Sequence, residues 1–492
     1  MRGILDVFSP EILELITREY QKCDPEHFRN LRLVSKVVNE LVEPLVFSTV
    51  TFYFMKEEEP NHIPELLKYI ISGASPFVRW AKELHIRDMV PTAADGWLEH
   101  DPWLGEEREM MLASQKEDLV PAIKSLIRVQ HVKFTVNEGE SFKDPLCAVA
   151  ELPGLRDLEL TFSYSFDFVN TQVPLARFSK LRSLSLRRLV PTPGIVEGLK
   201  HLIASSPSLS QLTIICFSAK PDDEQDGVNQ HYLDLCSLLE ATGPPAASLS
   251  EHTVKDIISS SVAIQALSIA GGQILAPTVV PSLRSLTALH IFNDYVQIDP
   301  LFWSALQNSQ IHLRKLTVVL ILQPIIDYLL SYNGLEAITI SHSNCDPGID
   351  RANEEPFVHL FFGAVLPKHS GSLRLIELDD TVERAWIITQ SYLQGVLACK
   401  RLECLTLTYA FPWKDEPEWE PGRLVIPLAD LFSAVSTNLP QLRALTLRQY
   451  SQLEEEEEPD LRFSLSMIQV LNIVDLNSIW MQQVEGSFVP QV

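Results

Sequence analysis

A short apolar pattern recurs along most of this 492-residue chain and constrains its fold more than any other feature. The pattern is apolar-x-x-apolar-x-apolar. Its last two apolar positions are two residues apart, which puts both side chains on one face of a strand. Weaker matches at Val129-Val132-Phe134 and Leu84-Ile86 precede the clear copies. The eleven clear copies are Leu155-Leu158-Leu160, Leu181-Leu184-Leu186, Leu209-Leu212-Ile214, Ile264-Leu267-Ile269, Leu286-Leu289-Ile291, Leu313-Leu316-Val318, Leu335-Ile338-Ile340, Leu373-Ile376-Leu378, Leu402-Leu405-Leu407, Leu442-Leu445-Leu447 and Ile468-Leu471-Ile473.

Helical patterns lie between the copies and end at breakers, as in Ile195–Ser205 before Pro207 and Leu428–Val435 before Pro440. Successive copies begin about 22 to 40 residues apart, many near 26, which is the period of leucine-rich repeats. Each helix, turn and strand needs its neighbours to bury its inner face. The sequence therefore predicts an α/β fold. We expect residues 81–492 to form a leucine-rich-repeat solenoid with a parallel concave sheet and outer helices.

Two features depart from a regular array. Many leucine-rich repeats place Asn or Cys after the strand, whereas this chain has Ser163, Leu189, Phe217, Gly272, Asp294 and Ser343. We therefore expect irregular loops without an asparagine ladder. Charged insertions also interrupt the copies, at Asp222–Asp226, Lys414–Arg423 and Glu454–Glu458. Such runs are usually solvated loops, and docking of a partner is the alternative.

Charge and cysteine usage exclude several classes of partner and compartment. The chain has 64 acidic against 40 basic residues, a net charge of −24. This balance disfavours nucleic acid and anionic membranes, which both require clustered Lys and Arg. The seven cysteines are scattered and include no C-x-x-C pair, so neither a disulfide framework nor a zinc site is expected. The chain opens without an apolar signal segment, and we expect a soluble intracellular protein, cytoplasmic or nuclear.

The first fifty residues follow a different pattern, typical of three short helices. Ser9 caps the first helix, which begins at Pro10, and Asp24-Pro25-Glu26 marks the start of a second. Ser35 caps a third helix, which we expect Pro44 to end. We expect residues 1–50 to form a small helical module. Residues 51–80 would then supply a connecting strand or linker and an irregular first repeat.

These residues resemble an F-box, most closely those of filamentous fungal proteins. The resemblance rests on Phe8-Ser9-Pro10-Glu11-Ile12-Leu13, Leu31-Arg32-Leu33-Val34-Ser35-Lys36 and Leu41-Val42-Glu43-Pro44-Leu45-Val46-Phe47. It covers about forty residues, and the middle segment is its most specific part. Phe8 and Ser9 stand where the family has Leu and Pro.

The resemblance implies that the module docks on the SCF adaptor subunit and, through it, on a cullin–RING ubiquitin ligase, while the repeats bind a protein substrate. The module is alternatively only a cap on a leucine-rich-repeat scaffold or receptor. The adaptor-binding residues that it implies are Pro10, Ile12, Leu13, Ile16, Leu31, Val34, Ser35, Leu41 and Leu45. The sequence does not separate those that bind the adaptor from those that form the module's own core.

No nucleotide-binding, nucleophile-elbow or metalloprotease motif occurs in the sequence, so we expect a non-catalytic protein without cofactor or metal. The residue between the last two apolar positions of each copy should point out from the sheet, where solenoids usually bind partners. This column, a candidate substrate surface, comprises Glu159, Ser185, Thr213, Ser268, His290, Thr317, Thr339, Glu377, Thr406, Thr446 and Asn472. Thr and Ser suit exposed strand positions, so the column predicts a surface and no particular ligand.

Overall fold

The computed structural model describes residues 10–24, 27–54, 62–87, 89, 113–136, 142–163, 166–216, 233–240, 262–292, 296–341, 355–379, 386–409, 426–449 and 461–464. The chain forms two compact units. The N-terminal unit comprises Met1–His231 and Leu238–Val262, and the C-terminal unit comprises Tyr232–Ser237 and Ala263–Val492. The last copy of the pattern, at 468–473, and the three charged insertions lie outside the described residues.

The N-terminal unit opens with a helical segment and continues as alternating helices and strands. Its elements are α1 (Pro10–Cys23), the 3-10 helix η2 (Phe28–Leu33), α2 (Lys36–Val46), β1 (Thr49–Tyr53), α3 (Ile63–Ile71), α4 (Pro76–Trp80), β2 (Glu83–Arg87), α6 (Leu119–Ser125), β3 (His131–Val136), α7 (Lys143–Ala150), β4 (Asp157–Phe162), η5 (Leu175–Arg177), β5 (Ser183–Leu189), α8 (Pro193–Ala204) and β6 (Gln211–Cys216).

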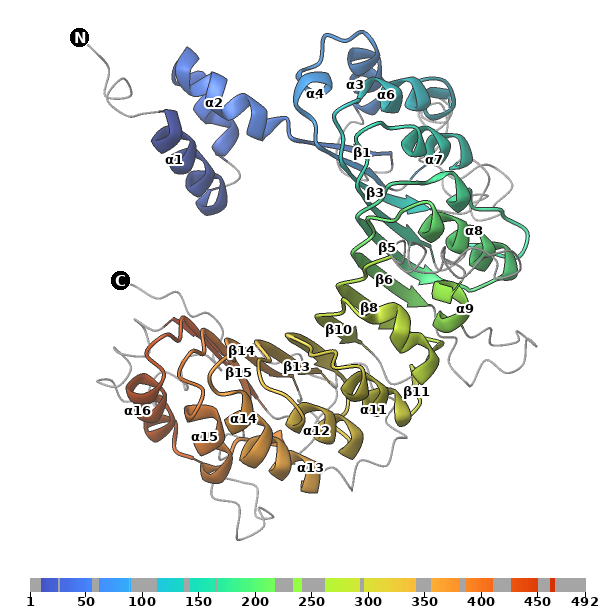
Figure 1. The fold of residues 1–492 in the computed structure, drawn as a ribbon. Coiled ribbons are helices and arrows are strands. Elements are labelled where there is room, and N and C mark those ends of the chain that lie inside the picture. Colours follow the sequence, from blue (N-terminus) through green and yellow to red (C-terminus); the bar gives the residue numbers. More distant parts are fainter. Residues whose placement is uncertain are drawn as a thin grey trace, which may run out of the picture. The chain divides into compact units, whose positions relative to one another are not determined.

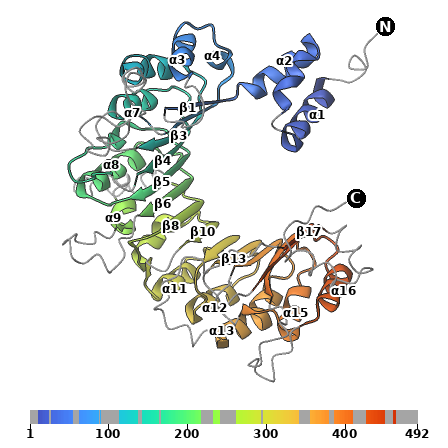
Figure 2. The same ribbon diagram turned by 180° about the vertical axis from the view of Figure 1, so that it is seen from behind.

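Strands β1 to β6 lie side by side in chain order, and each neighbouring pair is parallel. The sheet therefore begins with β1, in the region expected to hold an irregular first repeat. Parallel neighbours require a crossover connection, and helices or 3-10 turns supply it here. Figures 1 and 2 show these helices along one face of the strands, and no helix in the described part of this region covers the opposite face.

The C-terminal unit continues the same alternation. Its elements are β7 (Leu233–Asp234), β8 (Ala266–Ala270), β9 (Gln273–Leu275), η9 (Pro277–Leu283), β10 (Ala288–Ile291), β11 (Gln297–Ile298), α11 (Leu301–Asn308), β12 (Lys315–Val318), α12 (Gln323–Leu330), β13 (Ala337–Ser341), α13 (Glu355–Leu360), the π-helical η10 (Phe361–Val365), α14 (Leu366–His369), β14 (Leu375–Asp379), α15 (Gln390–Leu397), β15 (Cys404–Tyr409), α16 (Leu428–Asn438), β16 (Ala444–Gln449) and β17 (Leu461–Ser464). The residues of α9 (Leu235–Glu240) are divided between the two units.

Strands β8, β10, β12, β13, β14, β15 and β16 form the main sheet of this unit, each parallel to its neighbour. Strand β17 adds to β16 in the antiparallel direction. A small second sheet has the strand order β11-β9-β7. The predicted α/β class, with a large parallel sheet and helices on one face of it, is confirmed.

The core lies between the strands and the helices. In every copy of the pattern within the described residues, the last two apolar residues lie in a strand and are buried, as Leu158 and Leu160 are in β4. The first apolar residue is buried as well, just before the strand, as Leu181, Leu313 and Leu335 show. Because the strand alternates, the residue between the two buried positions faces away from the helices.

Side chains from the following segment hold the turn before several strands. The backbone N–H of Leu313 donates to the Tyr328 hydroxyl at 3.1 Å, and the Tyr332 hydroxyl donates to the Leu313 carbonyl at 2.9 Å. Leu335 has the same arrangement, with its N–H donating to His369 Nδ1 at 3.2 Å and its carbonyl accepting from Ser372 at 2.7 Å. These side chains satisfy buried backbone groups. In many leucine-rich repeats an asparagine ladder satisfies the turn carbonyls instead.

The same arrangement around Leu181 gives a first prediction. Its N–H donates at 3.2 Å to the hydroxyl of Ser206, which is fully buried, and its carbonyl accepts from Ser208 at 3.2 Å. Replacing Ser206 by Ala leaves a buried N–H without an acceptor and should lower the free energy of unfolding by about 1–3 kcal/mol. Urea denaturation of the full chain checks this. The exposed Ser179→Ala is the control, and an unchanged Ser206→Ala midpoint would contradict the prediction.

Candidate partner-binding surfaces

The helical segment of residues 10–46 has its own small core. Phe28, Val38 and Val42 are buried there, and four partly buried side chains pack against them. These four are Tyr20, Leu31, Leu45 and Val46. We refer to residues 10–46 as the N-terminal module.

Local hydrogen bonds define the turns of the module. Asp24 accepts at Oδ1 from the His27 N–H at 3.1 Å and at Oδ2 from the Tyr20 hydroxyl at 3.1 Å. The hydrogen bonds from His27 are the main reason why the pKa of Asp24 lies below its usual range. Ser35 caps α2 as expected, since its hydroxyl accepts from the Val38 N–H at 3.2 Å.

The structure specifies the type of the second helix and corrects the expected end of the third. The second helix is the short 3-10 helix η2, and its N-cap residue, His27, makes no side-chain capping hydrogen bond. Pro44 does not end the third helix, because α2 continues through it to Val46. Proline removes one N–H from the helix ladder and crowds the carbonyl four residues earlier, yet the chain stays helical for two more residues.

The structure separates the predicted adaptor-binding residues into two sets. Leu31, Leu41 and Leu45 are half-buried, and Leu31 and Leu45 pack on the module core. Ile12, Ile16 and Val34 are exposed by 46, 51 and 62%. The remaining three are Ser35, which caps α2, and Pro10 and Leu13, which lie in α1 with side chains outside the described part.

Sequence reasoning missed two of the most exposed apolar side chains of the module. Leu15 is exposed by 63% and Leu33 by 87%. Leu15 lies on the same side of α1 as Ile12 and Ile16, because residues three or four apart are neighbours on a helix surface. Leu33 directly precedes Val34 at the end of η2. We call Ile12, Leu15, Ile16, Leu33 and Val34 the exposed apolar set.

The second predicted surface, the column on the sheet, follows the strand register. In the N-terminal unit Glu159 pairs with Ser185, and Ser185 pairs with Thr213. The same line runs back from Glu159 through Lys133 and His85. Glu159 also forms an ion pair with Arg187 at 2.9 Å. These side chains share the sheet face opposite the helices.

In the C-terminal unit the register joins the other members of the column in one line. From β8 to β16 the paired residues are Ser268, His290, Thr317, Thr339, Glu377, Thr406 and Thr446. His290 Nδ1 and the Thr317 hydroxyl are 2.8 Å apart. Burial, and then the charge of Lys315, lower the pKa of His290, which is therefore neutral at pH 7. Asn472 lies outside the described residues.

A further line of residues runs along the edge where the strands begin. One carbonyl accepts two N–H groups of the next strand, as that of Gln130 accepts from Arg156 at 2.8 Å and from Asp157 at 3.0 Å. The first of the two donors lies just before its strand, as Arg156 lies before β4. We call the first residue of each such pair a member of the edge row. The row holds Lys82, Gln130, Arg156, Arg182 and Ser210 in one unit and Thr287, Arg314, Glu336, Arg374, Glu403 and Arg443 in the other.

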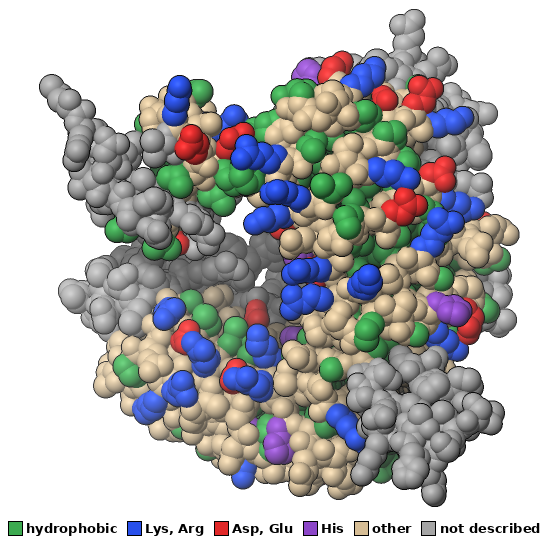
Figure 3. Space-filling model, turned by 45° about the horizontal axis from the view of Figure 1, so that its top comes forward, with side chains coloured by type: hydrophobic (Ala, Val, Ile, Leu, Met, Phe, Trp, Pro, Cys, Tyr) green, Lys and Arg blue, Asp and Glu red, His purple; other side chains and the backbone are tan. Residues whose placement is uncertain are grey.

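The charges of the edge row differ between the units. In the C-terminal unit acids and bases alternate and pair, with Arg314 donating to Glu336 at 2.9 Å and Arg374 donating to Glu403 at 2.6 Å. In the N-terminal unit Lys82, Arg156 and Arg182 are exposed. Figure 3 shows Lys and Arg side chains gathered on the visible face of the molecule.

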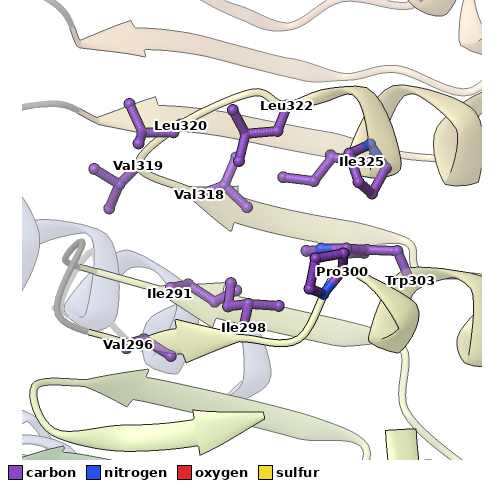
Figure 4. A pocket seen from close by; sticks show the side chains of 11 residues that line it. Ile291, Val296, Ile298, Pro300, Trp303, Val318, Val319, Leu320, Leu322 and Ile325 are labelled. Atoms are coloured by element: carbon purple, nitrogen blue, oxygen red, sulfur yellow. The ribbon is translucent and has the colours of Figure 1, made fainter. Parts of the chain in front are cut away.

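The pocket shown in Figure 4 belongs to the C-terminal unit and has a volume of about 220 Å³. It is lined by Ile291, Val296, Ile298, Pro300, Trp303, Val318, Val319, Leu320, Leu322, Pro324 and Ile325. None of these side chains titrates near neutral pH, so this pocket offers no general acid, base or nucleophile. Within the described part of the chain, no three His, Cys, Asp or Glu residues are grouped as metal ligands would be.

Comparison with known proteins gives no family for the chain. No family model matches the sequence, and no curated protein matches it. Over the described segments, no helix is both long enough and apolar enough to cross a membrane. The functional argument therefore rests on the residues and their geometry.

Proposed function

We propose that the chain is a non-catalytic substrate-recognition subunit of an SCF-type ubiquitin ligase, acting in the cytoplasm or nucleus. In this proposal the N-terminal module is an F-box that docks on the adaptor subunit and, through it, on a cullin. The sheet-and-helix part is a leucine-rich-repeat solenoid that binds a protein substrate. The observation that carries the proposal is the exposed apolar set of the module.

The exposed apolar set is large for a module of this size. Five aliphatic side chains are at least 46% exposed within fewer than forty residues. Burial of one such side chain stabilises by about 1.5–3 kcal/mol, and a few buried anchors dominate most interfaces. Concentrated exposed apolar surface marks an interaction site. A module with so small a core also gains stability when a partner covers these side chains.

The solenoid part of the proposal is supported by the strand register. Each described copy of the pattern contributes one strand, and neighbouring strands align the same pattern position. Successive copies therefore stack with a constant register, as expected for repeats that contact only their neighbours. The face opposite the helices is then continuous along each unit and available to a protein partner.

A second candidate is a scaffold or receptor in which the module only caps the solenoid. The ring of Phe47, just after α2, meets that of Phe77 on α4 edge to face at a centroid distance of 5.0 Å. This contact joins the module to the first helices of the sheet region. If capping is its role, deletion of residues 1–46, which leaves β1 intact, should cause aggregation or unfolding. If docking is its role, the deletion should remove adaptor binding and leave the rest folded.

The docking proposal is tested by co-purification of the full chain with adaptor and cullin. Leu33→Asp with Val34→Asp should lower adaptor recovery at least tenfold, because two anchors become charged. Leu31 is left intact because it packs on the module core. The control is Val169→Asp, which changes a side chain 84% exposed elsewhere in the N-terminal unit.

Circular dichroism should show equal helix content in the double variant and the control. Capture of neither adaptor nor cullin by the wild-type chain would refute the ligase role. An unchanged yield from the double variant would refute docking through the exposed apolar set.

A further inference from the structure

The edge row of the N-terminal unit places cations on neighbouring strands. The N–H of Gln130 donates to the carbonyl of Lys82, that of Arg156 to Gln130, and that of Arg182 to Arg156, at 2.7–2.8 Å. These three cations therefore stand along one line from the start of β2 to the start of β5. Lys133, on β3, is a fourth exposed cation on the same sheet.

The acidic side chains of this sheet region already have partners. Glu159 pairs with Arg187, Asp157 pairs with His131, and Glu83 accepts from the Thr49 hydroxyl at 3.2 Å. Lys82, Lys133, Arg156 and Arg182 make no ion pair with any residue that the structure describes. We call these four residues the cationic strip.

We propose that the cationic strip binds an acidic, Asp- and Glu-rich segment of a partner protein. The inference deepens the proposed function by naming the class of substrate that the strip would bind. It rests on the proposed function only in treating the bound protein as a ligase substrate. The strip stands out because the chain as a whole carries a charge of −24. Unpaired cations grouped in an acidic protein form a local field that attracts and orients an acidic partner.

The spacing of the strip favours an extended segment. Neighbouring strands lie about 4.8 Å apart, so the distance from Lys82 to Arg182 across three strand gaps is about 14 Å. An extended chain rises about 3.3 Å per residue, so about five residues span this distance. Separate carboxylates along such a segment match separate cations. A single phosphate group would need its cations to converge on one point.

The paired edge row of the C-terminal unit supplies the contrast within the same molecule. There Arg314 and Arg374 already donate to Glu336 and Glu403. An acidic ligand would have to displace these carboxylates. We therefore assign acidic-segment binding to the N-terminal unit alone.

The test measures fluorescence anisotropy of a labelled ten-residue peptide of alternating Glu and Ser added to the full chain. We expect saturable binding at low salt that weakens at least tenfold between 50 and 300 mM salt. Arg156→Glu with Arg182→Glu should weaken binding at least tenfold. The control, Lys116→Glu with Arg177→Glu, alters two exposed cations elsewhere in the same unit by the same total charge and should change binding less than twofold.

Three further probes separate other ligands from the proposed one. A peptide with Gln for Glu should not bind. The proposal would be overturned if an otherwise uncharged peptide with one phosphoserine, or single-stranded RNA with the same charge as the Glu peptide, bound more tightly than the Glu peptide. Binding of the Glu peptide by the Arg156→Glu, Arg182→Glu variant as tightly as by the wild type would also overturn it. Adaptor recovery is measured on the same variants. If the Arg156→Glu, Arg182→Glu variant loses peptide binding but recovers the adaptor normally, the result supports binding by the cationic strip. If the wild-type chain binds the peptide but not the adaptor, only the ligase role is refuted.

Discussion

Replacing Gly395 by Ala should lower the free energy of unfolding of the C-terminal unit by about 3 kcal/mol. A Cβ atom at this position would lie 2.1 Å from the carbonyl oxygen of Phe362 and 3.0 Å from its carbonyl carbon. Both atoms belong to the backbone, so α15 and η10 must move apart. The rings of Phe362 and Tyr392 stack at 4.5 Å across the same contact and would separate as well.

The intrinsic helix propensity acts in the opposite direction. Alanine is more favourable than glycine in a helix by about 1 kcal/mol, which is smaller than the cost of the clash. At Gly363 in η10 a Cβ atom would meet nothing within 4 Å beyond its chain neighbours and its own helix backbone, so Gly363→Ala is the matched control and should not destabilise. Urea denaturation followed by circular dichroism compares the two. A Gly395→Ala variant as stable as wild type would show that the close approach is relaxed in solution.

Replacing His369 by Ala should destabilise the same unit by about 4 kcal/mol. The side chain is 1% exposed, its Nδ1 accepts from the Leu335 N–H at 3.2 Å, and its Nε2 lies 2.9 Å from the Leu329 carbonyl. Nε2 therefore carries the proton in the neutral ring. The substitution leaves a cavity and two buried backbone groups without a partner. His359→Ala, at an exposed histidine of the same unit, should cost under about 1 kcal/mol.

The same histidine should make the wild-type protein sensitive to mild acid. Burial lowers the pKa of His369 from 6.5 to about 4. A histidine kept neutral by the fold contributes stability above pH 6.5, and this contribution falls as the pH drops from 6.5 to about 4. The loss amounts to about 3 kcal/mol, and His369→Ala should lack it. Urea midpoints measured from pH 7.5 to 4 check both statements. Equal pH slopes in the wild type and His369→Ala would contradict the assignment.

The sheet and its column were predictable because both depend on a period of two along the strand. Placing Leu158 and Leu160 in the core fixes the opposite direction for Glu159, and a parallel register then aligns Glu159 with Ser185. The antiparallel strand β17 was not predicted, because the segment around it lacks the six-residue pattern. The edge row was not predicted either, since the sequence does not show which carbonyl accepts two N–H groups.

The helical module was predictable only in outline. Ser35 predicted the cap of α2, because its hydroxyl can accept from a free backbone N–H at the start of the helix. The sequence did not predict which aliphatic side chains of the module are buried and which are exposed. Leu31 and Leu33 are equally apolar and differ only in what packs against them. Leu31 contacts the core around Phe28, whereas Leu33 has no such cover. Short segments without a clear stripe leave this choice to tertiary contacts.

The hydrogen bonds to Leu181, Leu313 and Leu335 give the array a direction. In each case the backbone of an earlier segment is completed by side chains that come later in the chain. A chain cut after β5, β12 or β13 would lose the side chains that complete its last turn, whereas a cut before one of these strands would leave the earlier turns intact. Fraying should therefore proceed from the carboxyl side toward the amino side. During synthesis, each new segment of this kind would complete the hydrogen bonds of the turn made just before it.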